Sequence, residues 1–174
     1  MSTAPLMRRV GDHFVAHNAL VIGDVTIGAG TNLWFNVVVR GDVSSISLGP
    51  RVNLQDGVIV HTDYGTPNDI EGHVVAGHGA VLHGRRIGHG CLIGMKAVLL
   101  SGSEIGAESL VAAGCVVPER MVVPPRSLVA GVPGKIIGEV SQKWLERTRY
   151  INAHYLELAE RYVSGEFRVA SGER

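Results

Sequence analysis

The chain has 174 residues, with 16 basic and 16 acidic side chains, 23 glycines and 5% aromatic residues. Its length fits one domain, and the balanced charge excludes the basic excess of nucleic-acid-binding proteins and gives no reason for docking on an anionic membrane. No apolar run approaches the ~18 residues that span a bilayer, and the N-terminus lacks the apolar segment of a signal peptide. We therefore expect a cytoplasmic protein with no nucleic-acid or membrane partner.

An aliphatic residue returns every six positions along most of the chain. The series runs through Val15, Val21, Ile27, Leu33 and Val39, resumes after a three-residue insertion at Leu48, Leu54 and Val60, and then occupies Ile87, Ile93, Leu99, Ile105, Val111, Val117, Val123 and Val129. Period six matches neither an amphipathic helix nor a long alternating strand. It predicts a prism of about six stacked coils, each with three short parallel strands that pair with the next coil at ~4.8 Å.

The fifth place of each hexad is mostly small or β-branched, and we expect it to point inward together with the first place. Cys91 and Cys115 occupy fifth places and are interpreted as packing residues. Between the two regular stretches, first places at Ile70, Ala76 and Leu82 are preferred, because the competing alignment would bury the unpaired charge of Arg85. Residues 62–69 read as a polar loop that leaves the prism.

After Pro133 the period changes to that of a helix. The apolar stripe consists of Trp144, Thr148, Ile151, Tyr155, Leu158 and Tyr162, and Ser141 is a suitable N-cap. We expect the helix to pack along the prism and a tail to follow from about Ser164. The chain is thus divided into a hexapeptide-repeat domain at 1–137 and a C-terminal helix and tail at 138–174.

When the hexads are assigned to the three faces of the predicted prism, three histidines fall on two adjoining faces. Arg40, His61 and His83 share the second place on one face in three successive coils, whereas Asp56 and His78 share the third place on the adjoining face. Two imidazoles one coil apart can hold one metal ion at ~2.0–2.1 Å, and three with a water molecule make an open catalytic site. His78 cannot reach that ion within one chain, but a three-fold trimer would bring it from the next subunit. The remaining histidines are interpreted as surface or hydrogen-bonded residues: His13, His17, His73, His89 and His154.

Four motifs carry a resemblance to a known family. They are N-V-V-V-R-G-D at 36–42, N-L-Q-D-G at 53–57, V-I-V-H at 58–61 and G-H-G-A-V-L-H-G at 77–84. In these segments, and from about His17 to Tyr162, the chain resembles the gamma-class carbonic anhydrases. The resemblance implies a mainly β fold, a left-handed parallel β-helix with a packed C-terminal helix, and a homotrimer with shared sites.

The resemblance also implies a reaction and roles for its residues. His61 and His83 of one subunit and His78 of its neighbour would bind Zn²⁺, with Fe²⁺ or Co²⁺ in some members, and metal-bound hydroxide would convert carbon dioxide, a small-molecule substrate, to bicarbonate. Gln55 would orient the hydroxide and Asn53 would support it. Arg40 and Asp56 would form an ion pair near the trimer interface, with Asp42 as a further carboxylate there.

The chain departs from the most active family pattern in ways that bear on rate. Val43 stands where those members have a glutamate, and the loop that carries their proton-shuttling glutamate is shorter here. Asp63, Asp69 and Glu71 are the carboxylates available in its place, and Tyr150, Asn152 and Tyr155 could approach the site from the helix. A low activity would follow from a missing shuttle.

Two other functions stay open at this point. Ala130 to Ile136 resembles the C-terminal segment of hexapeptide acyltransferases, in which a histidine acts as general base toward an acyl-thioester. A metal-dependent thioesterase acting on an acyl-CoA is a variant of that reading. The third possibility is a non-catalytic scaffold trimer, since the hexads serve any of these functions.

Overall fold

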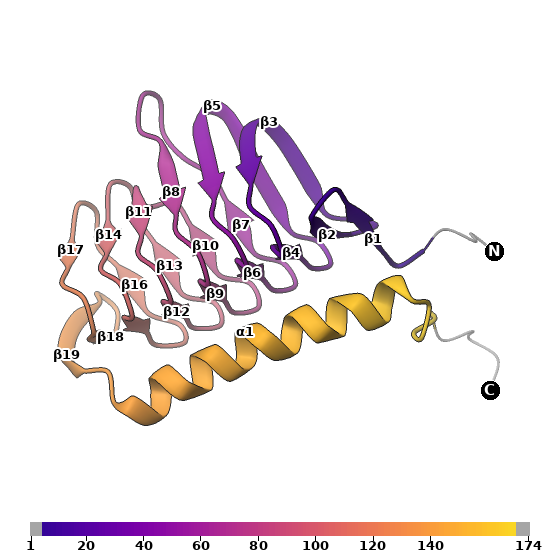
Figure 1. Cartoon of the computed structure of the whole chain (residues 1–174). Coiled ribbons are helices and arrows are strands. Elements are labelled where there is room, and N and C mark those ends of the chain that lie inside the picture. The colour runs from indigo at the N-terminus through magenta and orange to yellow at the C-terminus, as the bar shows by residue number, and fades with distance from the viewer. Residues whose placement is uncertain (1–4, 170–174) are drawn as a thin grey trace.

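The computed structural model describes residues 5–169 as a triangular prism of parallel strands with one helix laid along it (Figure 1). The first face is a sheet whose strands pair in the order β1 (Met7–Val10), β2 (His13–Ala16), β4 (Asn32–Leu33), β6 (Asn53–Leu54), β9 (Val75–Ala76), β12 (Leu92–Ile93), β15 (Leu110–Val111), β18 (Ser127–Ala130) and β19 (Lys135–Glu139). Only its two outermost pairs, β1 with β2 and β18 with β19, are antiparallel.

The second and third faces share two long strands that turn the corner between them. These are β3 (Leu20–Ile27) and β5 (Val38–Leu48), and β5 pairs with β7 (Ile59–Val60) near its start and with β8 (Asn68–Ile70) near its end. The second face continues through β10 (Val81–Leu82), β13 (Val98–Leu99) and β16 (Val116–Val117), and the third through β11 (Arg86–Ile87), β14 (Glu104–Ile105) and β17 (Val122–Val123). The mainly β fold and the parallel β-helix of about six coils are confirmed.

The core is the aliphatic column that the six-residue period predicts. Ile70, Ala76 and Leu82 are fully buried, and Arg85 is exposed, so the preferred register is confirmed. Val21 is a correction, because 40% of it is exposed. It lies in β3, which within residues 5–169 pairs only with β5 and begins the stack, so no coil of the described chain covers it.

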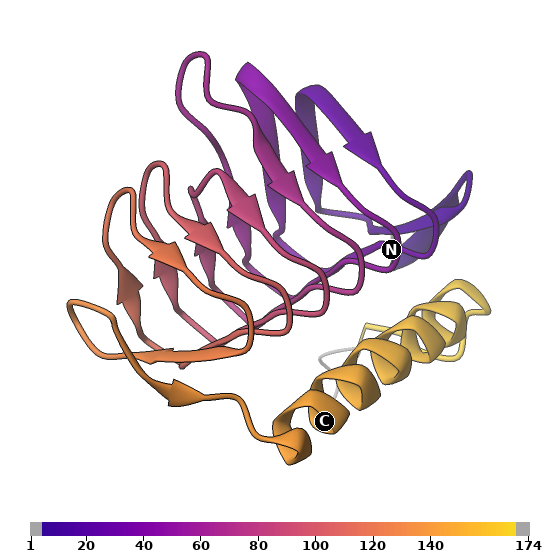
Figure 2. The same ribbon diagram turned by 60° about the vertical axis from the view of Figure 1, so that its left-hand side comes forward.

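Helix α1 (Gln142–Val163) runs along the first face, across β4, β6 and β9 (Figure 2). It begins after Ser141 as predicted, although the Ser141 side chain makes no capping hydrogen bond. The buried stripe is shifted from the predicted one: Leu145 is buried and Trp144 is 42% exposed. Within residues 5–169 the helix is too polar to cross a membrane, and residues 170–174 of the predicted tail lie outside the described residues.

Candidate metal-binding site

Two histidines lie one coil apart on the second face, as the sequence predicts. The strands β5, β7 and β10 pair in parallel, so Arg40, His61 and His83, which follow the inward residues of these strands, are stacked along the prism. The ring centroids of His61 and His83 are 5.2 Å apart and their planes meet at 41°. Both side chains are mostly buried but remain partly accessible to solvent (20% and 24% exposed).

A carboxylate links the arginine of this ladder to its first histidine. Arg40 Nη1 donates a hydrogen bond to Asp42 Oδ2 at 2.6 Å, and Asp42 Oδ1 lies 3.2 Å from His61 Nε2. The hydrogen bond from Arg40 lowers the pKa of Asp42, and the contact with His61 adds to the effect. Asp42 is therefore charged at neutral pH, and its expected place near a trimer interface stays a prediction.

Asp63 makes the corresponding contact with the second histidine. Its Oδ1 lies 3.2 Å from His83 Nε2, although the sequence alone offered no position for it. Hydrogen bonds from Ser101 and His83 lower the pKa of Asp63. The signal for this placement is only that Asp63 follows β7 by three residues, where the chain leaves the prism in the turn closed by the Asp63–Thr66 bridge.

His78 lies on the first face, in the coil next to that of β6, and each of its two ring nitrogens has a polar neighbour. Its Nδ1 is 2.9 Å from Asp56 Oδ2, because the parallel pairing of β6 with β9 brings these third places together. The hydroxyl of Tyr155 on α1 lies 3.4 Å from His78 Nε2. Burial raises the pKa of Tyr155, and the charge of Asp56 adds to this shift.

A chain of buried side chains fixes Gln55 between the helix and the first face. Gln55 Nε2 donates to Asn53 Oδ1 at 3.1 Å, and Asn53 Nδ2 donates to Asn32 Oδ1 at 2.6 Å. The same Asn32 oxygen accepts a hydrogen bond from Trp34 Nε1 at 2.9 Å. Sequence reasoning missed Asn32, although Asn-Leu recurs at 32–33 and 53–54 on one face and marks the pairing of β4 with β6.

The other candidate residues lie away from these histidines. Asp69 accepts from Ser47 and Glu71 from Arg86, on the third face and the corner that follows it. Asn152 donates to the carbonyl of Arg51, and Tyr150 is exposed and stacks on His154. In one chain, Arg40 pairs with Asp42 and Asp56 with His78, so an Arg40–Asp56 ion pair requires two chains and stays a prediction.

The imidazoles have the chemistry of a metal site, but one chain divides them between two faces. Within residues 5–169, no three His, Cys, Asp or Glu side chains of a single chain converge as ligands. His61 and His83 are spaced for one shared ion, which would replace the carboxylates at their Nε2 atoms. Asp56 lies at Nδ1 of His78, as carboxylates commonly do beside metal-bound histidine, so Nε2 is the ligand atom, and a metal ion there would take the place of the Tyr155 contact. These residues therefore fit a metal ion that three imidazoles bind, such as Zn²⁺, Fe²⁺ or Co²⁺.

Comparison with known proteins identifies the group to which this chain is related. The family model described as bacterial transferase hexapeptide (six repeats) matches residues 86–119. A protein of Methanocaldococcus jannaschii named "Probable carbonic anhydrase" is 40% identical over 146 residues, which cover 84% of this chain and 92% of the relative. Gamma carbonic anhydrase 2, mitochondrial, of Arabidopsis thaliana is 35% identical over 88% of this chain and 57% of its own length. The chain belongs to the gamma-class carbonic anhydrase-like family.

Solved structures place this family member among hexapeptide-repeat proteins more widely. A hexapeptide transferase family protein from Anaplasma phagocytophilum superposes with a TM-score of 0.81 at 31% identity, over 88% of this chain and 90% of that one. The gamma-class relatives thus support an enzyme that hydrates carbon dioxide at family level, and the transferase neighbour shares the fold. One named relative is archaeal and one mitochondrial, so the cytoplasmic location stays a prediction.

Proposed function

We propose that the chain catalyses the reversible hydration of carbon dioxide to bicarbonate at metal sites that two copies of it complete. The observation that carries the proposal is the arrangement of the three imidazoles. His61 and His83 are stacked on one face, and His78 is presented on the next face with Nδ1 held by Asp56. A homotrimer would join the second face of one subunit to the first face of its neighbour.

Zinc is the proposed ion, with iron or cobalt as alternatives, and when bound it would supply an activated water molecule by lowering that water's pKa. The chain's own contribution is orientation. Because Gln55 uses Nε2 to bind Asn53, its Oε1 is the atom left to accept a hydrogen bond from the reacting oxygen. Asn53 holds Gln55 in place, and an Arg40–Asp56 ion pair would join the two subunits.

Proton removal from the site is expected to be the slow step of the proposed reaction. Asp42 and Asp63 have lowered pKa values, and a carboxylate of low basicity accepts a proton poorly near pH 7. We therefore expect slow turnover that rises with the concentration of an external imidazole buffer. A rate independent of buffer would mean that another group carries the proton.

Metal content and turnover test the proposal together. Protein purified without chelator should hold about one transition-metal ion per chain, and His78→Ala should lose it while remaining folded, since an open site needs three imidazoles. His154→Ala, at an exposed histidine on α1, is the matched control and should keep the metal. Gln55→Ala should keep the metal and lose about ten- to hundredfold in hydration rate. Wild-type protein that cannot be loaded with zinc, iron or cobalt would overturn the proposal.

Acyl transfer to or from an acyl-CoA is the second candidate, supported by a groove between α1 and the first face. The groove has a volume of about 550 Å³, is lined mainly by apolar residues such as Leu92, Leu110 and Trp144, and reaches Gln55 and His78. Calorimetry with coenzyme A separates the two functions: micromolar binding together with absent carbon dioxide hydration would favour acyl transfer. Full metal occupancy with turnover of neither substrate would favour a scaffold trimer.

A further inference from the structure

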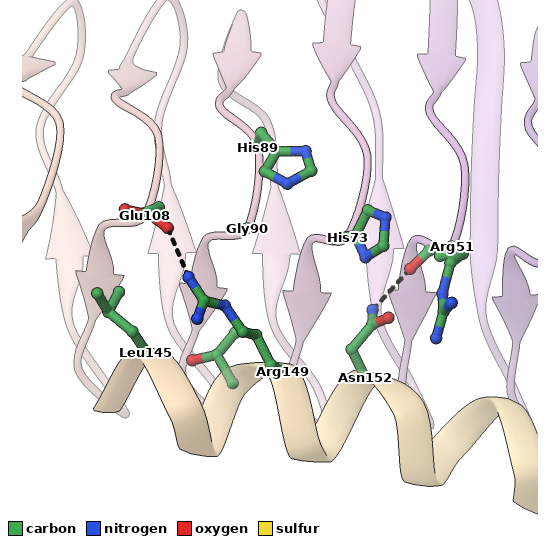
Figure 3. Close-up of a pocket in the computed structure, with 9 residues that line it drawn as sticks. Arg51, His73, His89, Gly90, Glu108, Leu145, Arg149 and Asn152 are labelled. Carbon is green, nitrogen blue, oxygen red and sulfur yellow. Dashed lines mark hydrogen bonds and ion pairs between the residues drawn. The ribbon is translucent and has the colours of Figure 1, made fainter. Parts of the chain in front are cut away.

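A polar cavity of about 350 Å³ lies between α1 and the corner where the third face turns into the first (Figure 3). It contains none of the residues assigned to the candidate metal site. Thr148 of the helix lines it, together with six charged, imidazole or amide side chains: Arg51, His73, His89, Glu108, Arg149 and Asn152. The last two come from the helix and the others from successive coils, so helix and prism build the cavity jointly.

The backbone explains why these side chains converge. Arg51, His73 and Glu108 have φ values of +56°, +61° and +57°, and Gly90 occupies the same place in the coil between the last two. Each coil thus makes the same left-handed turn at this corner, and its side chains leave the prism as a column. Asn152 donates to the Arg51 carbonyl at 2.7 Å and fixes α1 against the column, so the cavity is formed in advance.

The charges of the lining are unbalanced in favour of the cations. Glu108 is already shared, because Arg149 lies 3.1 Å from one of its oxygens and Arg126 lies 3.6 Å from the other. Within residues 5–169, Arg51 makes no ion pair, and its Nε is buried with no hydrogen-bond partner. A guanidinium without an ion-pair partner beside a cavity is suited to bind an anion.

Two imidazoles complete the donor set. The rings of His73 and His89 have centroids 5.0 Å apart and are tilted by 51°, and Figure 3 shows His73 between Arg51 and His89. Burial lowers the pKa of His73, and the neighbouring His89 and Arg51 add to the shift. A cation would be repelled by Arg51, whereas an anion would stabilise both the guanidinium and protonated imidazoles.

We propose that this cavity binds a phosphate-type oxyanion, either as free phosphate or as the phosphoryl group of a small metabolite. The Arg51 guanidinium would bind two of its oxygens in the planar, two-pronged manner that suits phosphate, and His73 and His89 would donate to the others. The volume exceeds that of one phosphate group and leaves room for the carbon skeleton of a monoester. No step of carbon dioxide hydration depends on this site.

Calorimetry on the full chain tests the proposal with inorganic phosphate and ribose 5-phosphate as probes. Either probe should bind, and tighter binding of the ester would identify a phosphorylated metabolite as the source. Arg51→Gln should weaken binding at least about tenfold, because it removes a charge-assisted hydrogen-bond pair. Arg120→Gln is the matched control, since Arg120 has the same φ of +56°, does not line this cavity and has a side chain that is 85% exposed.

A second readout keeps the test decisive if the Arg51 variant does not fold. The charged groups around the two imidazoles are Arg51, Glu108 and Arg149, which line the same cavity, and Glu71, which accepts a hydrogen bond from the His89 backbone amide. A bound anion should raise the pKa of His73 in the wild-type protein, as followed by NMR, and His73→Gln should weaken binding. Absence of binding up to about 10 mM phosphate, equal affinity in Arg51→Gln, or the same response to chloride at equal ionic strength would each overturn the proposal.

Discussion

Replacing Asn32 by leucine should destabilise the protein far more than its single side chain suggests. Asn32 is 1% exposed, and its Oδ1 accepts hydrogen bonds from Trp34 Nε1 and Asn53 Nδ2, both of which are also buried. Leucine has a similar volume, so the cavity term is small, but it leaves two buried donors unpaired. An orphaned buried donor costs about 1–3 kcal/mol, so the expected loss is about 2–6 kcal/mol, a large part of the ~5–15 kcal/mol of a typical domain.

Urea unfolding at one fixed protein concentration measures this loss, because assembly would make stability depend on concentration. With a slope of about 2 kcal/mol per molar urea, the midpoint should fall by roughly 1–3 M. Asn18→Ala is the matched control, since it also breaks an amide–amide hydrogen bond, to Asn36, but at the surface, and it should cost under about 0.5 kcal/mol. Equal losses in the two variants would refute the argument. The leucine variant should also lower hydration activity without losing metal, because Asn53, no longer held by Asn32, would position Gln55 less firmly.

Three further outcomes follow from buried and paired groups. Burial raises the pKa of Cys91 to about 12, so the native protein at pH 8 should resist thiol labelling at this position and react there once unfolded in guanidinium. Leu99→Ala, at a fully buried first place, should lower the unfolding free energy by about 2–5 kcal/mol through loss of apolar contacts and a cavity, and a loss below about 1 kcal/mol would show that the coils collapse around the gap. Burial opposes ionisation of Glu71, but hydrogen bonds from Arg86 and the His89 amide outweigh it and lower the pKa of Glu71; the contact therefore adds stability above the ordinary carboxyl pKa and loses it as pH falls through the folded-state value. Arg86→Gln should raise the Glu71 pKa in an NMR titration, and an unchanged value would contradict this assignment.

The prism could be predicted because the same residue types recur at the same place in every coil. An inward first place must be aliphatic in every coil, so Leu82 and Leu99 show the same signal many times over. The alignment around Arg85 followed from the cost of burying one charge. The prediction for Val21 is wrong because periodicity does not show where the stack ends; in the part of the chain that the structure describes, β3 has no neighbour on its outer side.

In the candidate site, the sequence could predict the contacts that the register of the hexads determines, but not those made by irregular segments. The contact of Asp56 with His78 follows from counting hexads, whereas Asp63 reaches His83 through an irregular turn that no repeat describes. The helix shows the same limit. Its buried stripe includes Asn152, which a hydrophobic pattern overlooks because the side chain is satisfied by the carbonyl of Arg51.

Helix α1 has a consequence for how the molecule comes apart. Coils that contact only their neighbours unfold like a row of weakly linked units, fraying from either end. Here the helix starts beside the last coils, where Arg149 contacts Glu108, and extends back to the first strands, where Arg9 of β1 pairs with Glu160. If one end of the prism opens, the helix loses its contacts there, and this weakens its contacts with the other end. Helix α1 therefore makes unfolding of the coils a single cooperative event. Without this helix, the chain would lose its coils one at a time.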